Sequence, residues 1–178
     1  DLQEYVNELT KTEMVEYFRP NFWPNTPDIN PYQLQNNNEA QFIIRYILAA
    51  TLSSNTGIYG PVYEQMISEA VPGKEEYLDS EKYEIKNWDW NHKNKLSYLI
   101  QRINQQRKLE PALQQTKNIE FCPIENDQMI AYIKWNDDLT NELLVVVNLD
   151  PNYAQQANVH IPFERISLHA DEAFQVQD

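Results

Sequence analysis

The sequence predicts an α/β region over residues 1–111, followed by an all-β region over residues 112–178. Up to Pro111, helical patterns with apolar residues three and four positions apart alternate with short extended runs. Beyond Pro111 the helical period gives way to extended runs that are joined by turn-forming residues. A chain of 178 residues allows one full domain or parts of two. We therefore expect a domain boundary near Pro111.

The first predicted helix carries its apolar residues on one face, at Leu2, Val6 and Leu9. Thr10 and Glu13 have the spacing of a capping box, which predicts that Thr10 begins a second short helix. This helix should end at Arg19, because a proline disfavours the helical conformation in the residue before it. Residues 21–23 then predict a short strand, since the prolines that follow would remove ladder hydrogen bonds.

The next predicted helix is apolar nearly all round from Phe42 to Leu52, with Asn38 as its expected N-cap. A helix without a polar face is packed on several sides. Residues 56–61 predict a second short strand with glycines at its ends, whereas residues 62–92 show no clear period. Loops of that length are usually functional or disordered, and the aromatic residues favour order. A last amphipathic helix has its apolar face at Leu96, Leu99, Ile100 and Ile103.

Four extended runs predict the strands of the second region: 119–121, 129–135, 143–148 and 159–163. The segments between them are rich in Asn and Asp, which favour turns. The first region contains only two strand–helix units, and closing a barrel takes about eight. We therefore expect the chain to be a fragment of a larger protein.

The charge of the chain argues against several classes of partner. Asp and Glu number 27 against 14 Lys and Arg, which gives a formal net charge of −13. Such a chain repels phosphate backbones and anionic lipid surfaces, so we expect neither a nucleic-acid-binding nor a membrane protein. No apolar run approaches the roughly 20 residues that span a bilayer, and no signal-peptide pattern opens the chain.

Several cofactor and metal sites are also excluded by composition. Cys122 is the only cysteine, so neither an internal disulfide nor a Cys-rich zinc site is expected, and a reducing cytoplasm fits. Three glycines leave no room for a dinucleotide fingerprint or a P-loop. The histidines are too scattered for metal ligation: His92, His160 and His169.

Four motifs in order give the chain a specific resemblance. They are YFRPNFWPNTPD at 17–28, AATLSS at 49–54, GIYGP at 57–61 and PGKEEYLDSEKY at 72–83. Together they resemble the bacterial α-1,4-glucan:maltose-1-phosphate maltosyltransferases, a branch of the α-amylase superfamily of retaining glycoside hydrolases. The resemblance implies that residues 1–111 are the C-terminal portion of a (β/α)8 (TIM) barrel. It also implies that residues 112–178 begin an all-β C-terminal sandwich domain.

The resemblance further implies which residues act. Retaining transfer uses two carboxyl groups about 5–5.5 Å apart, and the family takes both from strands upstream of this chain. A third carboxylate follows the seventh strand and stabilises the transition state, and its position here is Asp28. Most α-amylases have a histidine before that aspartate, whereas this chain has Pro27, which argues against an ordinary starch hydrolase. Lys82 and Tyr83 match the family's Lys-Tyr pair, which binds the donor.

Each of these residues also has a plain structural interpretation. Asp28 has the sequence context of a turn or helix-capping aspartate, and Lys82 that of a solvated lysine beside an acidic residue. Asn25 fits a turn former better than a ligand. Trp88 and Trp90 fit packing of the long loop better than stacking on a glucan. The acidic residues of this loop predict a solvated surface.

We therefore expect a cytoplasmic glycosyltransferase that moves maltosyl from maltose 1-phosphate to the non-reducing end of α-1,4-glucan and releases phosphate. The resemblance implies a role in glycogen or α-glucan synthesis, no metal or organic cofactor, and a homodimer for the full-length protein. One alternative is another hydrolase or transglycosylase of the same superfamily. A second is that the isolated fragment is a non-catalytic glucan-binding module. We expect the fragment alone to be inactive, because the nucleophile and the acid/base lie upstream.

Overall fold

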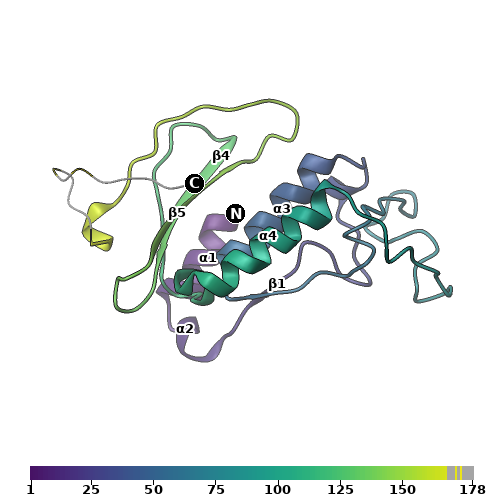
Figure 1. Ribbon diagram of the computed structural model, residues 1–178, viewed down its shortest axis with the longest axis horizontal. Helices are drawn as coiled ribbons and strands as arrows, with labels where there is room; N and C mark the ends of the chain where they lie inside the picture. The colour runs from purple at the N-terminus through teal and green to yellow at the C-terminus, as the bar shows by residue number, and fades with distance from the viewer. Residues whose placement is uncertain (168–170, 172, 174–178) are drawn as a thin grey trace.

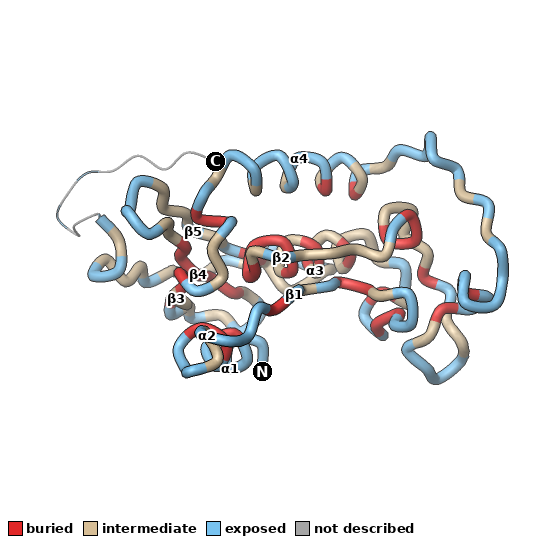
Figure 2. Tube along the Cα trace, turned by 90° about the horizontal axis from the view of Figure 1, so that it is seen from below, coloured by how far each residue is buried: buried red, intermediate tan, exposed pale blue. Residues whose placement is uncertain are grey.

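The computed structural model describes residues 1–167, 171 and 173, and within them helices and a small antiparallel sheet form one mixed arrangement (Figure 1). The α-helices are α1 (Leu2–Lys11), α2 (Met14–Tyr17), α3 (Glu39–Leu52) and α4 (Lys95–Leu109). The strands are β1 (Asn21–Phe22), β2 (Asn55–Thr56), β3 (Ile119–Phe121), β4 (Met129–Trp135) and β5 (Glu142–Asn148). Short 3-10 turns are η1 (Tyr32–Leu34), η2 (Pro111–Gln114) and η3 (Phe163–Arg165). Helix α3 lies between α4 on one side and α1–α2 on the other (Figure 2).

The first helix begins with a capping box at Asp1 instead of at Thr10. The Asp1 carboxylate accepts a hydrogen bond from the Glu4 backbone N–H at 2.9 Å, and the Glu4 side chain reaches back to Asp1. Thr10 lies inside α1, where its hydroxyl donates to the carbonyl of Val6 at 2.7 Å. The prediction that Thr10 caps a second helix is therefore wrong, because a threonine hydroxyl satisfied by the carbonyl four residues back allows the helix to continue.

Strands β1 and β2 pair in parallel, and α3 connects them. Asn21 lies opposite Asn55 and Phe22 opposite Thr56. Asn38 caps α3 as predicted, because its side-chain oxygen accepts from the Ala40 backbone N–H at 2.9 Å. The carboxyl ends of two parallel strands lie at the same edge, so the loops that follow β1 and β2 emerge side by side.

The strand predicted at 56–61 is shorter and begins one residue earlier, at Asn55. Immediately after it, the Trp23 ring covers the backbone of Gly57, where an added Cβ would lie 2.5 Å from the ring. The chain then turns away at a cis peptide bond between Gly60 and Pro61. The Gly57 N–H still donates to the carbonyl of Phe22 at 3.0 Å, so backbone pairing with β1 extends to this glycine, against which the Trp23 ring packs.

Residues 62–92 contain no helix or strand, in agreement with the prediction of a long irregular loop. Buried residues nonetheless order it, and Ala70 and Tyr77 form an isolated antiparallel bridge. Tyr63 is fully buried, and its ring lies 5.2 Å from that of Phe42 on α3, centroid to centroid. The loop is therefore packed onto the helices instead of extending freely into solvent.

Strands β3, β4 and β5 form where the first three extended runs predicted, and they pair as an antiparallel sheet in the order β3-β4-β5. The fourth predicted strand, at 159–163, is wrong. Only Val159 forms a bridge there, with Ile124, and the chain then enters η3. Pro162 lacks the N–H that a ladder requires, and this explains why the pairing stops.

One apolar core joins the sheet to the helices. Its buried members come from both sides of Pro111: Val6, Ile44, Leu52, Ile119, Ile130, Tyr132 and Val147. The hydroxyls of Thr51 on α3 and Tyr132 on β4 also share a hydrogen bond of 2.6 Å. The chain does turn at Pro111, between α4 and η2, but the division into two domains there stays a prediction.

None of the helices within the described residues combines the length and the apolar character needed to cross a lipid bilayer.

Candidate functional site

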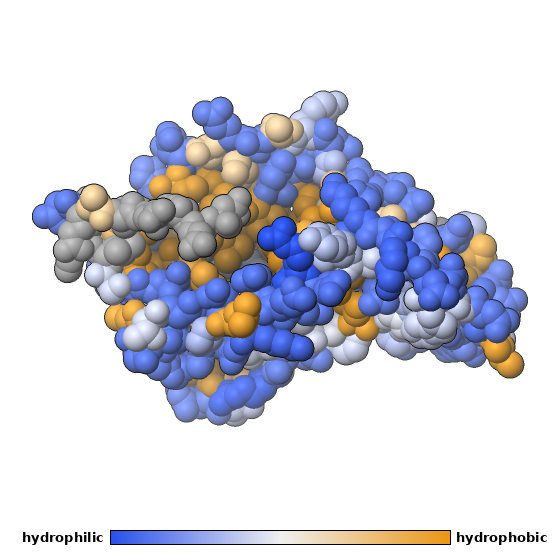
Figure 3. Space-filling view, in the orientation of Figure 1, coloured by the Kyte–Doolittle hydropathy of each residue, from blue (hydrophilic) through white to orange (hydrophobic). Residues whose placement is uncertain are grey.

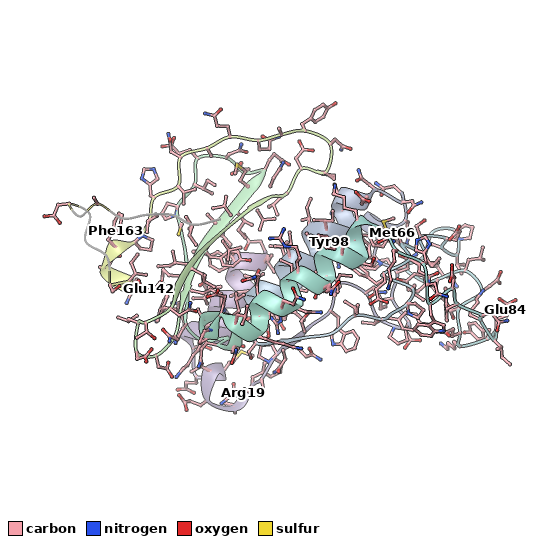
Figure 4. All side chains as sticks on the ribbon, in the orientation of Figure 1. Arg19, Met66, Glu84, Tyr98, Glu142 and Phe163 are labelled. Carbon is pink, nitrogen blue, oxygen red and sulfur yellow. The ribbon has the colours of Figure 1, made fainter. Side chains whose placement is uncertain are left out.

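The candidate site lies on the two loops that follow β1 and β2. Asp28 belongs to the first loop, and Lys82 and Tyr83 belong to the second. These loops form the end of the molecule away from the sheet, where Figure 4 labels Glu84. The surface of this end is predominantly hydrophilic (Figure 3).

The structure brings the three predicted site residues together although 54 positions separate Asp28 from Lys82. The Lys82 Nζ lies 3.6 Å from the Asp28 Oδ1, and their side chains are 56% and 70% exposed. The same ammonium lies 5.4 Å from the centroid of the Tyr83 ring. Tyr83 and then Asp28 raise the pKa of Lys82, so the ammonium stays charged at neutral pH. The cluster is accessible to a ligand.

Short turns hold Asp28 at the surface. The Thr26 and Ile29 backbones bond each other in both directions at 3.2 Å, and the Thr26 hydroxyl also accepts from the Ile29 N–H at 3.0 Å. Asp28 therefore projects from the tip of a tight loop. The Asn30 N–H then donates to the carbonyl of Glu75 at 3.1 Å, which ties this loop to the second one.

Asn25 does more than form a turn. It is 1% exposed, and its side-chain oxygen accepts from the Tyr59 N–H at 2.9 Å. Its side-chain nitrogen donates to the Tyr59 carbonyl at 3.2 Å and to the Tyr77 hydroxyl at 2.9 Å. The amide thus continues the pairing of β1 with β2 after the strands end. Its partners lie 34 and 52 residues away, so no local pattern could reveal them.

Asn30 is a second buried amide that sequence reasoning missed. It is fully buried and donates from Nδ2 to the carbonyl of Ser68 at 3.0 Å. Its Oδ1 is buried and has no hydrogen-bond partner among the described residues. Buried polar atoms are nearly always satisfied in proteins. An asparagine two residues after Asp28 gave no sequence signal for this burial.

The residues that precede Lys82 help to line a hollow of about 290 Å³ with aromatic walls. Glu81 lines it and accepts hydrogen bonds from the Tyr59 hydroxyl and, at 2.9 Å, from the Trp88 indole. These donors, Tyr59 first, lower the pKa of Glu81, so its carboxylate is ionised at neutral pH. Trp88 is partly buried and lines this hollow, whereas Trp90 is 72% exposed.

Metal and thiol chemistry receive no support within the residues that the structure describes. No group of three or more His, Cys, Asp or Glu residues there could hold a metal ion, and His169 lies outside the described residues. Burial raises the pKa of the Cys122 thiol to about 11, so the thiol stays protonated at neutral pH.

Chemically, the cluster offers a carboxylate, an ammonium, a phenol hydroxyl and an aromatic face on one exposed surface. A carboxylate accepts from sugar hydroxyls, and an ammonium binds an anionic group or donates to hydroxyls. A tyrosine supplies a flat apolar face with a polar end. This combination suits a phosphorylated or neutral sugar.

Comparison with known proteins gives a consistent result. A family model described as "GLGE, C-terminal" matches residues 121–178. The whole chain is 50% identical to the alpha-1,4-glucan:maltose-1-phosphate maltosyltransferase of Chlorobaculum tepidum and 46% identical to that of Methylacidiphilum infernorum, and it covers 28% and 27% of their lengths. Over 99% of the chain it is 44% identical to the Salinibacter ruber protein of the same name. The chain thus spans about a quarter of each of these relatives.

Proposed function

Since the chain is related along its whole length to the α-1,4-glucan:maltose-1-phosphate maltosyltransferases, we propose that it is part of a retaining glycosyltransferase. The full protein transfers maltosyl from maltose 1-phosphate to the non-reducing end of α-1,4-glucan and releases phosphate. The observation that carries this proposal on the structural side is the meeting of Asp28 and Lys82, from two distant motifs, at 3.6 Å.

The proposal includes a (β/α)8 barrel, of which this chain would form the last part. Strands β1 and β2 are parallel, α3 connects them, and α4 lies beside α3 (Figure 1). This arrangement fits the last two strand–helix units of a (β/α)8 barrel, whose active site lies at the carboxyl ends of its strands. Asp28 and Lys82 both follow such ends. The sheet β3–β5 then begins a C-terminal β-sandwich domain.

Each site residue has a distinct role in the proposed reaction. The Asp28 carboxylate accepts from sugar hydroxyls and stabilises the positive charge that develops on the sugar in the transition state. The Lys82 ammonium and Tyr83 hydroxyl bind maltose 1-phosphate. The upstream nucleophile forms the covalent maltosyl intermediate and expels phosphate, after which a glucan hydroxyl attacks and the configuration is retained. Neither a metal nor an organic cofactor takes part.

The decisive experiment measures phosphate release by the full-length protein, supplied with maltose 1-phosphate and a short maltooligosaccharide. Asp28→Asn should lower kcat by about a hundredfold or more, since it removes a charge that acts in the transition state. Glu84→Gln is the matched control, because Glu84 is an exposed carboxylate of the second loop, two residues after Lys82, and it pairs with Lys86. It should leave kcat unchanged.

Other outcomes would redirect the proposal. Phosphate release that Asp28→Asn does not change would remove the role of Asp28 and leave the reaction. Hydrolysis or isomerisation of unphosphorylated sugars would point to another enzyme of the α-amylase superfamily, and glucan binding without turnover to a binding module. The names of the relatives do not favour these alternatives.

The remaining parts of the proposal concern the setting of the enzyme. We place it in the cytoplasm, in glycogen or α-glucan synthesis, and as a homodimer in its full-length form. The net charge of −13 argues against nucleic acid or an anionic membrane as a partner.

A further inference from the structure

Tyr59 connects the two loops of the candidate site through its backbone and its side chain. Its N–H and C=O both bond the buried amide of Asn25, at 2.9 and 3.2 Å. Asn25 lies three residues before Asp28 in the same tight loop. The position of the Asp28 loop is therefore fixed relative to the backbone of Tyr59.

The side chain of Tyr59 reaches the second loop. Its hydroxyl donates to the carboxylate of Glu81, the residue that precedes Lys82. The other oxygen of this carboxylate accepts from the Trp88 indole N–H at 2.9 Å. Glu81 is thus held from two sides, while Lys82 extends towards Asp28.

Packing fixes the Tyr59 ring as well. It meets the Tyr77 ring edge to face, with centroids 6.1 Å apart, and the Tyr77 hydroxyl accepts from Asn25. Burial and the Glu81 carboxylate both raise the pKa of Tyr59, so its hydroxyl keeps the proton that it donates.

The Asp28–Lys82 contact cannot hold the two loops together by itself. Both side chains are more than half exposed, and exposed ion pairs contribute about 0–1 kcal/mol. Their 3.6 Å separation must therefore be set by the contacts that anchor the loops. Tyr59 makes two of these contacts, with Asn25 of the first loop and with Glu81 beside Lys82.

We infer that Tyr59 is a positioning residue, which places Lys82 against Asp28 through its hydroxyl bond to Glu81. This inference rests on the proposed function, since it gives Tyr59 its effect through a donor-binding lysine. A misplacement of about 1 Å in a binding group can cost about a hundredfold in rate, so a positioning bond has a measurable effect.

The test is a double-mutant cycle in the full-length protein, with kcat and KM measured for maltose 1-phosphate. Tyr59→Phe retains the ring and both backbone bonds and removes only the hydroxyl. Alone it should lower kcat/KM about tenfold, mainly by raising KM, while Lys82→Met should lower it further. In the Lys82→Met background, Tyr59→Phe should change kcat/KM less than about twofold, because the residue through which it acts is gone.

Tyr46→Phe provides the matched control. It also removes one tyrosine hydroxyl, which donates to Asn104 at 2.7 Å between α3 and α4 and takes no part in the bonds of Tyr59 with Asn25 and Glu81. It should leave kcat/KM unchanged with or without Lys82. Should Tyr59→Phe fail to fold, Glu81→Gln replaces it in the cycle, because it weakens the same bond at its acceptor.

The outcomes separate this inference from the proposed function. An active wild type in which Tyr59→Phe has no effect, or has the same effect with and without Lys82, overturns the positioning role alone. A wild type that releases no phosphate overturns the proposed function, and the inference falls with it.

Discussion

At the scale of single residues, Lys134 shows how the fold changes the chemistry of a side chain. It lies on β4 with no solvent exposure, and its ammonium donates to the carbonyl of Gln115 at 2.7 Å. Burial, and secondarily the charge of Arg107, lower the pKa of Lys134 to about 7. Desolvation disfavours the charged form of a lysine, so this residue loses its proton far more easily than a surface lysine does.

This pKa predicts how stability depends on pH. Below about pH 7 both the folded and the unfolded chain hold the proton, and the cost of burying the charge is fully present. Between pH 7 and the ordinary lysine value near 10.5, only the unfolded chain holds it, so stability rises with pH by up to about 1.4 kcal/mol per unit. Urea titrations of wild type and Lys134→Met at pH 7, 8 and 9 measure this. Equal pH slopes in the two proteins would contradict the prediction.

Asn25 is a residue whose role in the structure differs from the one that its sequence context predicted. Its sequence context, before a Thr-Pro pair, favoured a turn former, whereas it is buried and bonds Tyr59 and Tyr77. The turn that was expected does exist, and Thr26 and Ile29 form it. The local interpretation was therefore right about the loop but missed the residue that anchors it.

At the scale of elements, the two ends of α3 are satisfied in different ways. Its N-terminus is capped locally by Asn38, and its C-terminus by a side chain from another helix. Arg107 of α4 donates to the carbonyls of Ala50, of Ser53 at 3.1 Å and of Ser54 at 2.7 Å. The last carbonyls of a helix have no partners within it, so this cation caps α3 and complements its dipole.

Removing this cap should destabilise the packing of α3 on α4. Arg107→Met retains much of the apolar stem but leaves the three carbonyls without their donor. We expect a loss of roughly 2–3 kcal/mol in the free energy of unfolding, measured by urea titration with tryptophan fluorescence. Arg102→Met is the control, because Arg102 is exposed on the same helix, and it should cost less than about 0.5 kcal/mol. Equal losses in the two variants would show that Arg107 does not act as a cap.

At the scale of the whole molecule, the region before Pro111 and the sheet after it share one core. Ile44 and Leu52 of α3 belong to the same buried cluster as Ile130 and Tyr132 of β4. A groove lined by apolar residues of α1, β1 and α3 adjoins this cluster, and Leu52 belongs to both. Its lining includes Leu2, Tyr5, Phe18, Phe22, Trp23 and Leu48.

We predict that the isolated 178-residue chain releases no phosphate from maltose 1-phosphate, with or without glucan. The family resemblance assigns the nucleophile and the acid/base to strands outside it, and Asp28 and Lys82 alone cannot form a glycosyl intermediate. Phosphate assays of the isolated chain and of the full-length protein, at equal concentration, check this. Release by the isolated chain above the rate without protein would contradict the assignment of the upstream carboxylates.

The sequence by itself determined those features that depend on near neighbours along the chain. These features are the Asn38 cap, the apolar face of α4 and strands β3 to β5. They follow from residue spacings of a few positions, because the backbone geometry of a helix or strand sets which near neighbours share a face. Motifs of this kind also carried the resemblance, and with it the choice of Asp28, Lys82 and Tyr83.

Only the tertiary structure decided features that depend on partners far away in sequence. Thr10 continues a helix, residues 159–163 do not pair as a strand, and Asn25 is an anchor. The 3.6 Å contact of Asp28 with Lys82 joins residues 54 positions apart. Such contacts depend on how α3 and two irregular loops pack, and packing has no period that a sequence pattern could show.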